Sequence, residues 1–215
     1  LIVWLENPGS TSNQPWRRRI VDDRVHGIHG LITGDVDGDG KLDIAVTVTG
    51  RGTYILKNNS TPGKLSFTQV AFLPGGGGYQ IAAGDLNNDG KIDLVNTQGS
   101  ILWTYRNTST PGNISFVRNT NINNLHHATG LAIVDVDGDG LADIGTSSGP
   151  RNLVTAVRNT TAPGATTFTF ASTQAFSTLS RYPYRLFLGD FDKDGKVDFV
   201  ANNHSGATTS IFRNN

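Results

Sequence analysis

The sequence predicts an all-β fold, a β-propeller built of four-stranded antiparallel blades. An acidic loop occurs four times, and the first aspartates of successive loops are separated by 50, 50 and 55 residues. Short β-prone runs bounded by Gly, Pro and Asn fill the chain between the loops. Runs this short do not form helices of useful length. Four strands in a repeat of about 50 residues suit a propeller blade better than a solenoid coil.

Each acidic loop alternates acidic or amide residues with others over nine positions and then enters a β-prone run. All but three of the 18 acidic residues lie in the four loops, and the exceptions are Glu6, Asp22 and Asp23. Concentrating carboxylates in this way causes repulsion unless a cation offsets it. The loops align without a gap as Gly34–Asp43, Gly84–Asp93, Val134–Asp143 and Gly189–Asp198.

Oxygen donors at alternate positions of a tight loop are the ligands that calcium prefers, and a glycine at position 6 permits the sharp turn. We expect about four Ca²⁺ ions, one in each loop. Zinc is disfavoured because the chain has no Cys and the loops have no His, and magnesium favours fewer protein oxygens. The predicted ligands are the side chains at positions 1, 3, 5 and 9 and the backbone carbonyl at position 7: Asp35, Asp37, Asp39, Lys41 and Asp43; Asp85, Asn87, Asp89, Lys91 and Asp93; Asp135, Asp137, Asp139, Leu141 and Asp143; Asp190, Asp192, Asp194, Lys196 and Asp198.

Two other interpretations of the loops were weighed. An EF-hand needs a bidentate Glu at position 12 and a following helix. Here position 12 holds Val46, Asn96, Thr146 and Ala201, and a β-prone run follows. A polar Asp-Gly turn without metal explains one such loop more readily than four.

The strands between the loops define the units. One strand precedes each loop and one follows it. A third ends in Asn58, Asn107, Asn159 or Asn214, and a Phe-bearing fourth (167–170 in the third complete unit) follows a Pro-Gly turn. We expect a single propeller region over residues 1–215, with blade repeats at about 1–27 (partial), 28–77, 78–127, 128–180 and 181–215 (partial). This makes 17 strands, four blades and one surplus strand.

These residues resemble the FG-GAP/VCBS repeat family, in which a D-x-D-x-D-G-x-x-D loop joins the first two strands of each blade. The resemblance covers essentially the whole chain. Members include the integrin α head, fungal propeller lectins and propeller domains attached to polysaccharide-degrading enzymes, and the style here is closest to secreted fungal and microbial lectins and matrix proteins. The resemblance implies a propeller but no particular partner. Because the family usually closes seven blades, four loops indicate part of a larger or assembled propeller.

A ligand is expected on the face opposite to the loops, where the sequence places all five histidines. Aromatic rings beside hydrogen-bonding groups suit a sugar, whose ring stacks and whose hydroxyls need partners. The candidate ligand-binding residues are His29, Tyr79, His127, Tyr184 and Arg185. We therefore expect a binding module for a glycan or an extracellular protein. Loop residues without a ligand are the competing interpretation.

Two further function classes stay open at this stage. A polysaccharide lyase would use Tyr184 with Arg185, or His127 with Arg151, but these residues share no repeated pattern, so we assign no catalytic residue. A structural or adhesive matrix protein would assemble through exposed blade edges or associate with further propeller segments.

The remaining composition bears on compartment and partners. Six N-x-S/T sequons favour a secreted glycoprotein. Scattered basic residues argue against nucleic acid. No stretch approaches the roughly 18 apolar residues of a membrane span.

Overall fold

The computed structural model describes residues 1–215 except 8, 10–13, 76 and 126. The described part of the chain is all-β, with 17 strands, one short 3₁₀ helix (His204–Gly206) and five antiparallel sheets. A two-stranded sheet comes first, three four-stranded sheets follow, and a three-stranded sheet ends the chain. The predicted fold class is therefore confirmed.

The strands of each sheet follow one another in sequence. The first sheet is the hairpin of β1 (Ile2–Glu6) and β2 (Arg17–Asp22), and the next contains β3 (Ile28–Gly34), β4 (Asp43–Val48), β5 (Gly52–Asn58) and β6 (Phe67–Pro74). The third contains β7 (Ile81–Gly84), β8 (Asp93–Gln98), β9 (Ile101–Asn107) and β10 (Phe116–Ile122). The last two contain β11 (Ala128–Val134), β12 (Asp143–Ser148), β13 (Leu153–Val157) and β14 (Gln174–Ser177), then β15 (Pro183–Gly189), β16 (Asp198–Asn203) and β17 (Thr208–Phe212).

The second strand of each four-stranded sheet is buried on both faces. Every residue of β4 and β12 is buried, and only the last residue of β8 is exposed. Alternating burial is expected where one face of a sheet meets water. Its absence here shows that each of these sheets is covered on both sides by its neighbours, as in a propeller.

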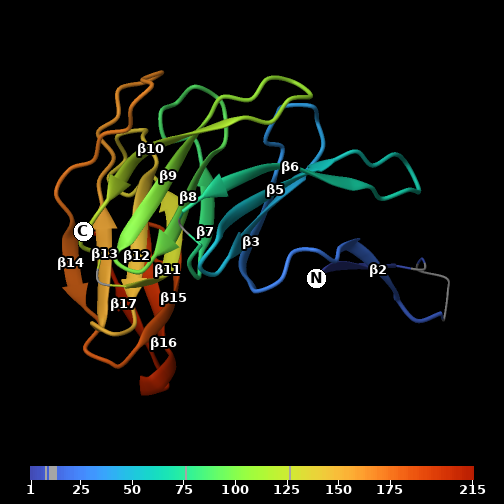
Figure 1. Ribbon diagram of the computed structural model, residues 1–215. Coiled ribbons are helices and arrows are strands. Elements are labelled where there is room, and N and C mark those ends of the chain that lie inside the picture. Colours follow the sequence, from blue (N-terminus) through green and yellow to red (C-terminus); the bar gives the residue numbers. More distant parts are fainter. Residues whose placement is uncertain (8, 10–13, 76, 126) are drawn as a thin grey trace.

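The sheets are arranged as a four-bladed propeller (Figure 1). The first strands of the blades contact one another in sequence order, β3 with β7, β7 with β11 and β11 with β15. Among the described strands, no comparable contact joins β15–β17 to β3–β6. The blades therefore pack as a row of consecutive neighbours. The β1–β2 hairpin (dark blue) and β15–β17 (red) lie at opposite ends of this row.

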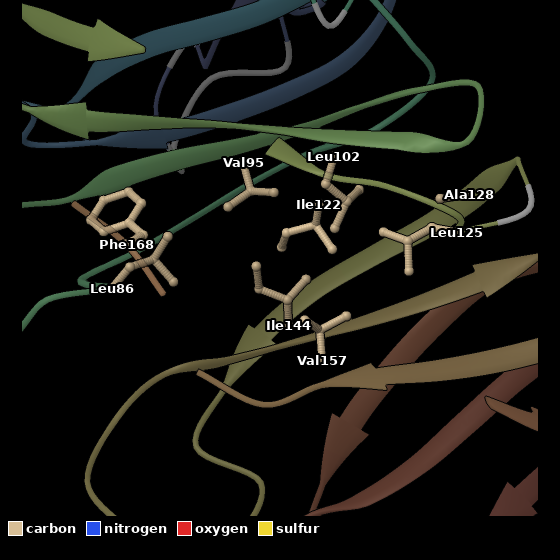
Figure 2. Packing of buried hydrophobic residues seen from close by; sticks show 9 residues of the cluster. All are labelled: Leu86, Val95, Leu102, Ile122, Leu125, Ala128, Ile144, Val157 and Phe168. Carbon is tan, nitrogen blue, oxygen red and sulfur yellow. The ribbon is translucent and has the colours of Figure 1, made fainter. Parts of the chain in front are cut away.

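The hydrophobic core lies between the sheets. Figure 2 shows one layer, in which Leu86, Val95 and Leu102 from the third sheet meet Ile144 and Val157 from the fourth. Full burial of each such side chain stabilises the fold by about 1.5–3 kcal/mol. Separate clusters join the hairpin to β3–β6, that sheet to β7–β10, and β11–β14 to β15–β17.

One predicted strand was wrong. In the third complete unit the fourth strand is β14 (Gln174–Ser177), whereas only an isolated bridge, Asn159 with Phe170, involves the predicted segment 167–170. Phe168 is 1% exposed and packs into the core layer of Figure 2. The longer spacing to the fourth loop supplies the extra residues. They carry this segment over the second loop, where the Gly164 backbone nitrogen donates to the Asn87 carbonyl at 2.6 Å.

Candidate metal centres and ligand-binding face

The aspartate at position 9 closes each acidic loop. Asp93 is buried, and its two oxygens accept hydrogen bonds from the backbone nitrogens of Asn107 (2.7 Å) and Leu86 (2.9 Å). The equivalent Asp43, Asp143 and Asp198 accept the same pair of bonds. Burial raises the pKa of Asp93 to about 6, although the two backbone bonds act in the opposite direction. Position 9 therefore ties the loop to the end of the third strand of its own blade.

The aspartate at position 1 curls the loop around a common centre. Asp35 accepts from the backbone nitrogens of Asp39 (3.1 Å) and Gly40 (2.9 Å). Gly40 has φ +85°, a left-handed conformation that glycine adopts without strain. As a result, carboxylate oxygens at positions 1, 3 and 5 of the first and fourth loops, and at positions 1, 3 and 9 of the third, lie within 4.8 Å of one another.

The second loop has an amide, Asn87, at position 3. Asn87 is 0% exposed, and its side-chain nitrogen donates to the carbonyl of Ala165 at 2.8 Å. Its side-chain oxygen is buried without a hydrogen-bond partner in the described structure. Buried polar atoms are normally satisfied. The unpartnered Asn87 oxygen is available to a cation, whereas its nitrogen also donates to Asp89 Oδ2 at 3.3 Å. Among the described residues, the aspartates of this loop do not converge as those of the other three loops do.

Basic side chains pair with the carboxylates at positions 3 and 5. Lys57 forms ion pairs with Asp37 and, at 2.7 Å, with Asp39. Burial acts to lower the pKa of Lys57, but these two ion pairs together raise it. Arg158 and Arg213 make the equivalent pairs in the third and fourth loops. The equivalent Arg106 faces a loop with Asn87 at position 3 and forms no ion pair with its described residues.

These cations were missed at the sequence level. A signal for them exists, because each directly precedes the asparagine that ends a third strand. The side chains of Lys57, Arg158 and Arg213 neutralise carboxylate oxygens that are also predicted metal ligands, so these cations compete with a metal ion for the same oxygens.

The asparagine at or just after the end of the third strand joins neighbouring blades. The side-chain nitrogen of Asn107 donates to the carbonyl of Ile92 in its own loop (2.9 Å) and to that of Val36 in the preceding loop (2.8 Å). Asn159 and Asn214 reach the equivalent carbonyls of Leu86 and Val136, each at 2.8 Å. We call this inter-blade bond the asparagine latch. The sequence shows the asparagines but not this role.

The candidate ligand-binding residues lie at the opposite end of the blades. His29, Tyr79, His127 and Tyr184 all lie at or just before the starts of β3, β7, β11 and β15, whereas the loops follow the ends of these strands. His29 and Tyr79 form an edge-to-face pair with ring centroids 5.2 Å apart. The ring centroids of Tyr184 and His204 lie 6.3 Å apart. The His127 backbone nitrogen donates a hydrogen bond to Ser100 Oγ.

The structure therefore brings His29 and Tyr79 together but does not gather all five candidates. No ring contact or hydrogen bond in the described structure joins this pair to Tyr184 or Arg185. Both Tyr184 and Arg185 are exposed on β15. His126, one of the five histidines, lies outside the described residues.

The repeat itself identifies the family. The FG-GAP-like repeat matches residues 35–96 and 87–146, which together span more than half of the chain. The chain belongs to the FG-GAP-like repeat family. Both matched segments start in an acidic loop and extend into the blade that follows.

Two solved structures superpose on this chain. The crystal structure of BBS1N in complex with ARL6DN, soaked with lead, is 12% identical and superposes with a TM-score of 0.51 over 90% of this chain and 57% of that one. The exotype rhamnogalacturonan lyase YesX is 18% identical, with a TM-score of 0.44 over 80% of this chain and 34% of that one. At 12% identity the likeness to the first of these structures shows the fold alone. No curated protein matches this FG-GAP repeat chain by sequence. None of its described helices is long and apolar enough to cross a membrane.

Proposed function

We propose that this FG-GAP repeat protein is a calcium-stabilised extracellular recognition module that binds a glycan or an extracellular protein on the face opposite to the acidic loops. The observation that carries the calcium proposal is the donor set of the loops. Carboxylate oxygens converge within 4.8 Å in three loops, and in the second the buried oxygen of Asn87 has no partner among the described residues. Such all-oxygen sets are typical of calcium sites.

Calcium acts on the fold in this proposal rather than on a substrate. Each loop connects the first two strands of a blade, and its position 9 carboxylate holds the end of the third strand. An ion bound by positions 1, 3 and 5 therefore holds the first three strands of the blade together at the loop end. Because the ion binds the folded loop in preference to the unfolded chain, it stabilises the blade by mass action.

The recognition surface is centred on His29 and Tyr79. Tyr79 is 46% exposed, so the pair presents ring surface and polar ring atoms to solvent. A sugar ring stacks on such a surface while its hydroxyls bond to the imidazole nitrogens and the phenol. Because His29 lies on β3 and Tyr79 lies just before β7, the surface spans a junction between two blades.

Two measurements test the proposal separately. Calorimetric titration of the chelator-treated protein with calcium is expected to show saturable binding, and heat that does not saturate would reject the metal sites. A glycan array with the wild type, His29→Ala and Tyr79→Ala tests the ligand face. Binding by the wild type that is lost in both variants but kept in Tyr184→Ala supports it. Binding that survives in both variants would move the recognition site elsewhere.

A further inference from the structure

The last sheet, β15–β17, has one uncovered apolar face. Phe187, Val200 and Ile211 are cross-strand neighbours on this face, which we call the tail face. Ile211 is 69% exposed, whereas Ile55, its counterpart in β3–β6, is 0% exposed in the cluster shared with β7–β10. The tail face thus has the composition of an inter-sheet contact, but none of the described sheets lies upon it.

The acceptor of an asparagine latch is also free at this end. Phe191, at position 2 of the fourth loop, is 57% exposed, and its counterpart Leu86 is 0% exposed. The carbonyl oxygens at position 2 of the first three loops each accept from an asparagine of the next sheet. We find no donor to the Phe191 carbonyl within the described ranges.

The β1–β2 hairpin carries the matching donor. Asn7 directly follows β1, and Asn107 is the last residue of β9. The side-chain oxygen of Asn7 accepts from the Gly9 backbone nitrogen at 3.0 Å. Asn107 makes the same turn with Ser109 at 2.8 Å. The side-chain nitrogen of Asn7 has no acceptor among the described residues. Asn7 therefore has the local geometry of a latch whose acceptor is missing.

The outward face of the hairpin is apolar as well. Val3, Leu5 and Ile20, which we call the head face, are 40%, 54% and 60% exposed. Val3 pairs with Ile20 across the two strands, and Leu5 pairs with Arg18. The opposite face, with Ile2, packs on β3–β6. Arg17 and Arg18, which lie opposite Glu6 and Leu5, are exposed at the Asn7 end of the hairpin.

We propose that a second copy of this chain covers the tail face, with the head face of one copy packed on the tail face of the other and Asn7 bonded to the Phe191 carbonyl. The contact repeats the inter-blade contact that already occurs three times within the chain. Because the two faces lie at opposite ends of the row (Figure 1), the contact is head-to-tail. Such a contact joins copies into a closed ring if its rotation completes a turn and into an open series if it does not.

Sedimentation velocity of the 215-residue chain in calcium, over a concentration series, tests this directly. The wild type is expected to form species that grow with concentration. Leu5→Asp blocks the head face and Ile211→Asp the tail face, and each variant alone is expected to be monomeric. Leu179→Asp is the matched control, because Leu179 is an exposed apolar residue outside both faces. Thermal melts of all the variants check that they fold.

An equal mixture of the two blocked variants is the decisive sample. A head-to-tail contact leaves one functional face on each variant, so the mixture is expected to form a dimer and nothing larger. Asn7→Asp is expected to weaken assembly about tenfold, since one hydrogen bond across the contact is lost. A monomeric wild type would overturn the proposal, because the tail face would then belong to a different partner. Assembly by either blocked variant alone, or a mixture that stays monomeric, would also overturn it.

Discussion

The side-chain nitrogen of Asn107 donates a hydrogen bond to the carbonyl oxygen of Val36, 71 residues earlier in the chain and one blade away. The same asparagine bonds its own loop through Ile92. One buried amide therefore holds two acidic loops at a fixed separation, and the metal-binding end of each blade is positioned by the blade after it.

Replacing this amide should be costly. Asn107→Ala leaves the carbonyls of Val36 and Ile92 without their donor, and each buried unsatisfied group costs about 1–3 kcal/mol. Asn58→Ala is the matched control, because the Asn58 side-chain nitrogen donates only to Leu42 at an exposed site among the described residues. Chemical denaturation of both variants should show a much larger loss of unfolding free energy for Asn107→Ala. Equal losses would mean that the inter-blade bond adds nothing.

Calcium removal should lower stability. Saturating calcium adds about 2.7 kcal/mol per site when its free concentration is a hundredfold above the dissociation constant. The melting temperature should therefore fall on addition of a chelator and recover with excess calcium, and magnesium at equal concentration should restore less. A melting temperature that does not change in chelator contradicts a structural role for the ion.

The basic residue beside a loop should have opposite effects with and without metal. Lys57→Met removes the ammonium group that pairs with Asp37 and Asp39. The metal-free protein should lose stability, because repulsion among the carboxylates is no longer offset. Calcium should bind the first loop more tightly, because no side chain competes for its oxygens. Calorimetry and melting in chelator measure the two effects, and Arg106→Met, beside the loop with an amide at position 3, should change calcium affinity less.

The first strands of neighbouring blades approach closely at Gly130, so replacing this glycine by a larger residue should destabilise the protein. A Cβ atom at Gly130 would lie 2.4 Å from Ser147 Oγ and 3.0 Å from the Leu186 backbone nitrogen. Gly130→Ala should therefore destabilise the protein by about 1–3 kcal/mol through overpacking. At Gly189 the nearest atom would be 3.6 Å away, so Gly189→Ala should be nearly neutral. Thermal melts of the two variants distinguish the sites, and similar melts would contradict the predicted clash.

Repetition is what made the fold predictable. Four loops in register, with short β-prone runs between them, indicate blades without any knowledge of distant contacts. The fourth strand of the third complete unit escaped prediction because Phe168 is drawn into the core between two sheets, a tertiary effect that a local Thr-Phe pattern does not reveal. Local β propensity is overridden by burial in such cases.

The acidic residues of the candidate metal centres follow from their spacing, but their partners do not. Lys57 lies 20 residues from Asp37 in sequence, and Asn107 lies 71 from Val36. Such pairs meet only because blades stack in order. For the same reason, the sequence predicted one face for the candidate ligand-binding residues but did not predict which of them are in contact. In the structure His29 contacts Tyr79, whereas Tyr184 contacts His204.

Among the described strands, the main contacts between sheets join consecutive blades, so folding approaches a one-dimensional problem. Each inner blade is held by two interfaces and each end by one, so cooperativity weakens toward both ends. Amide hydrogens in β8 and β12 should exchange through near-global opening, and those of β16 and β17 through local fraying. Adding a neighbour to an end would protect that end most, so the protein would gain rigidity as its row of blades grows.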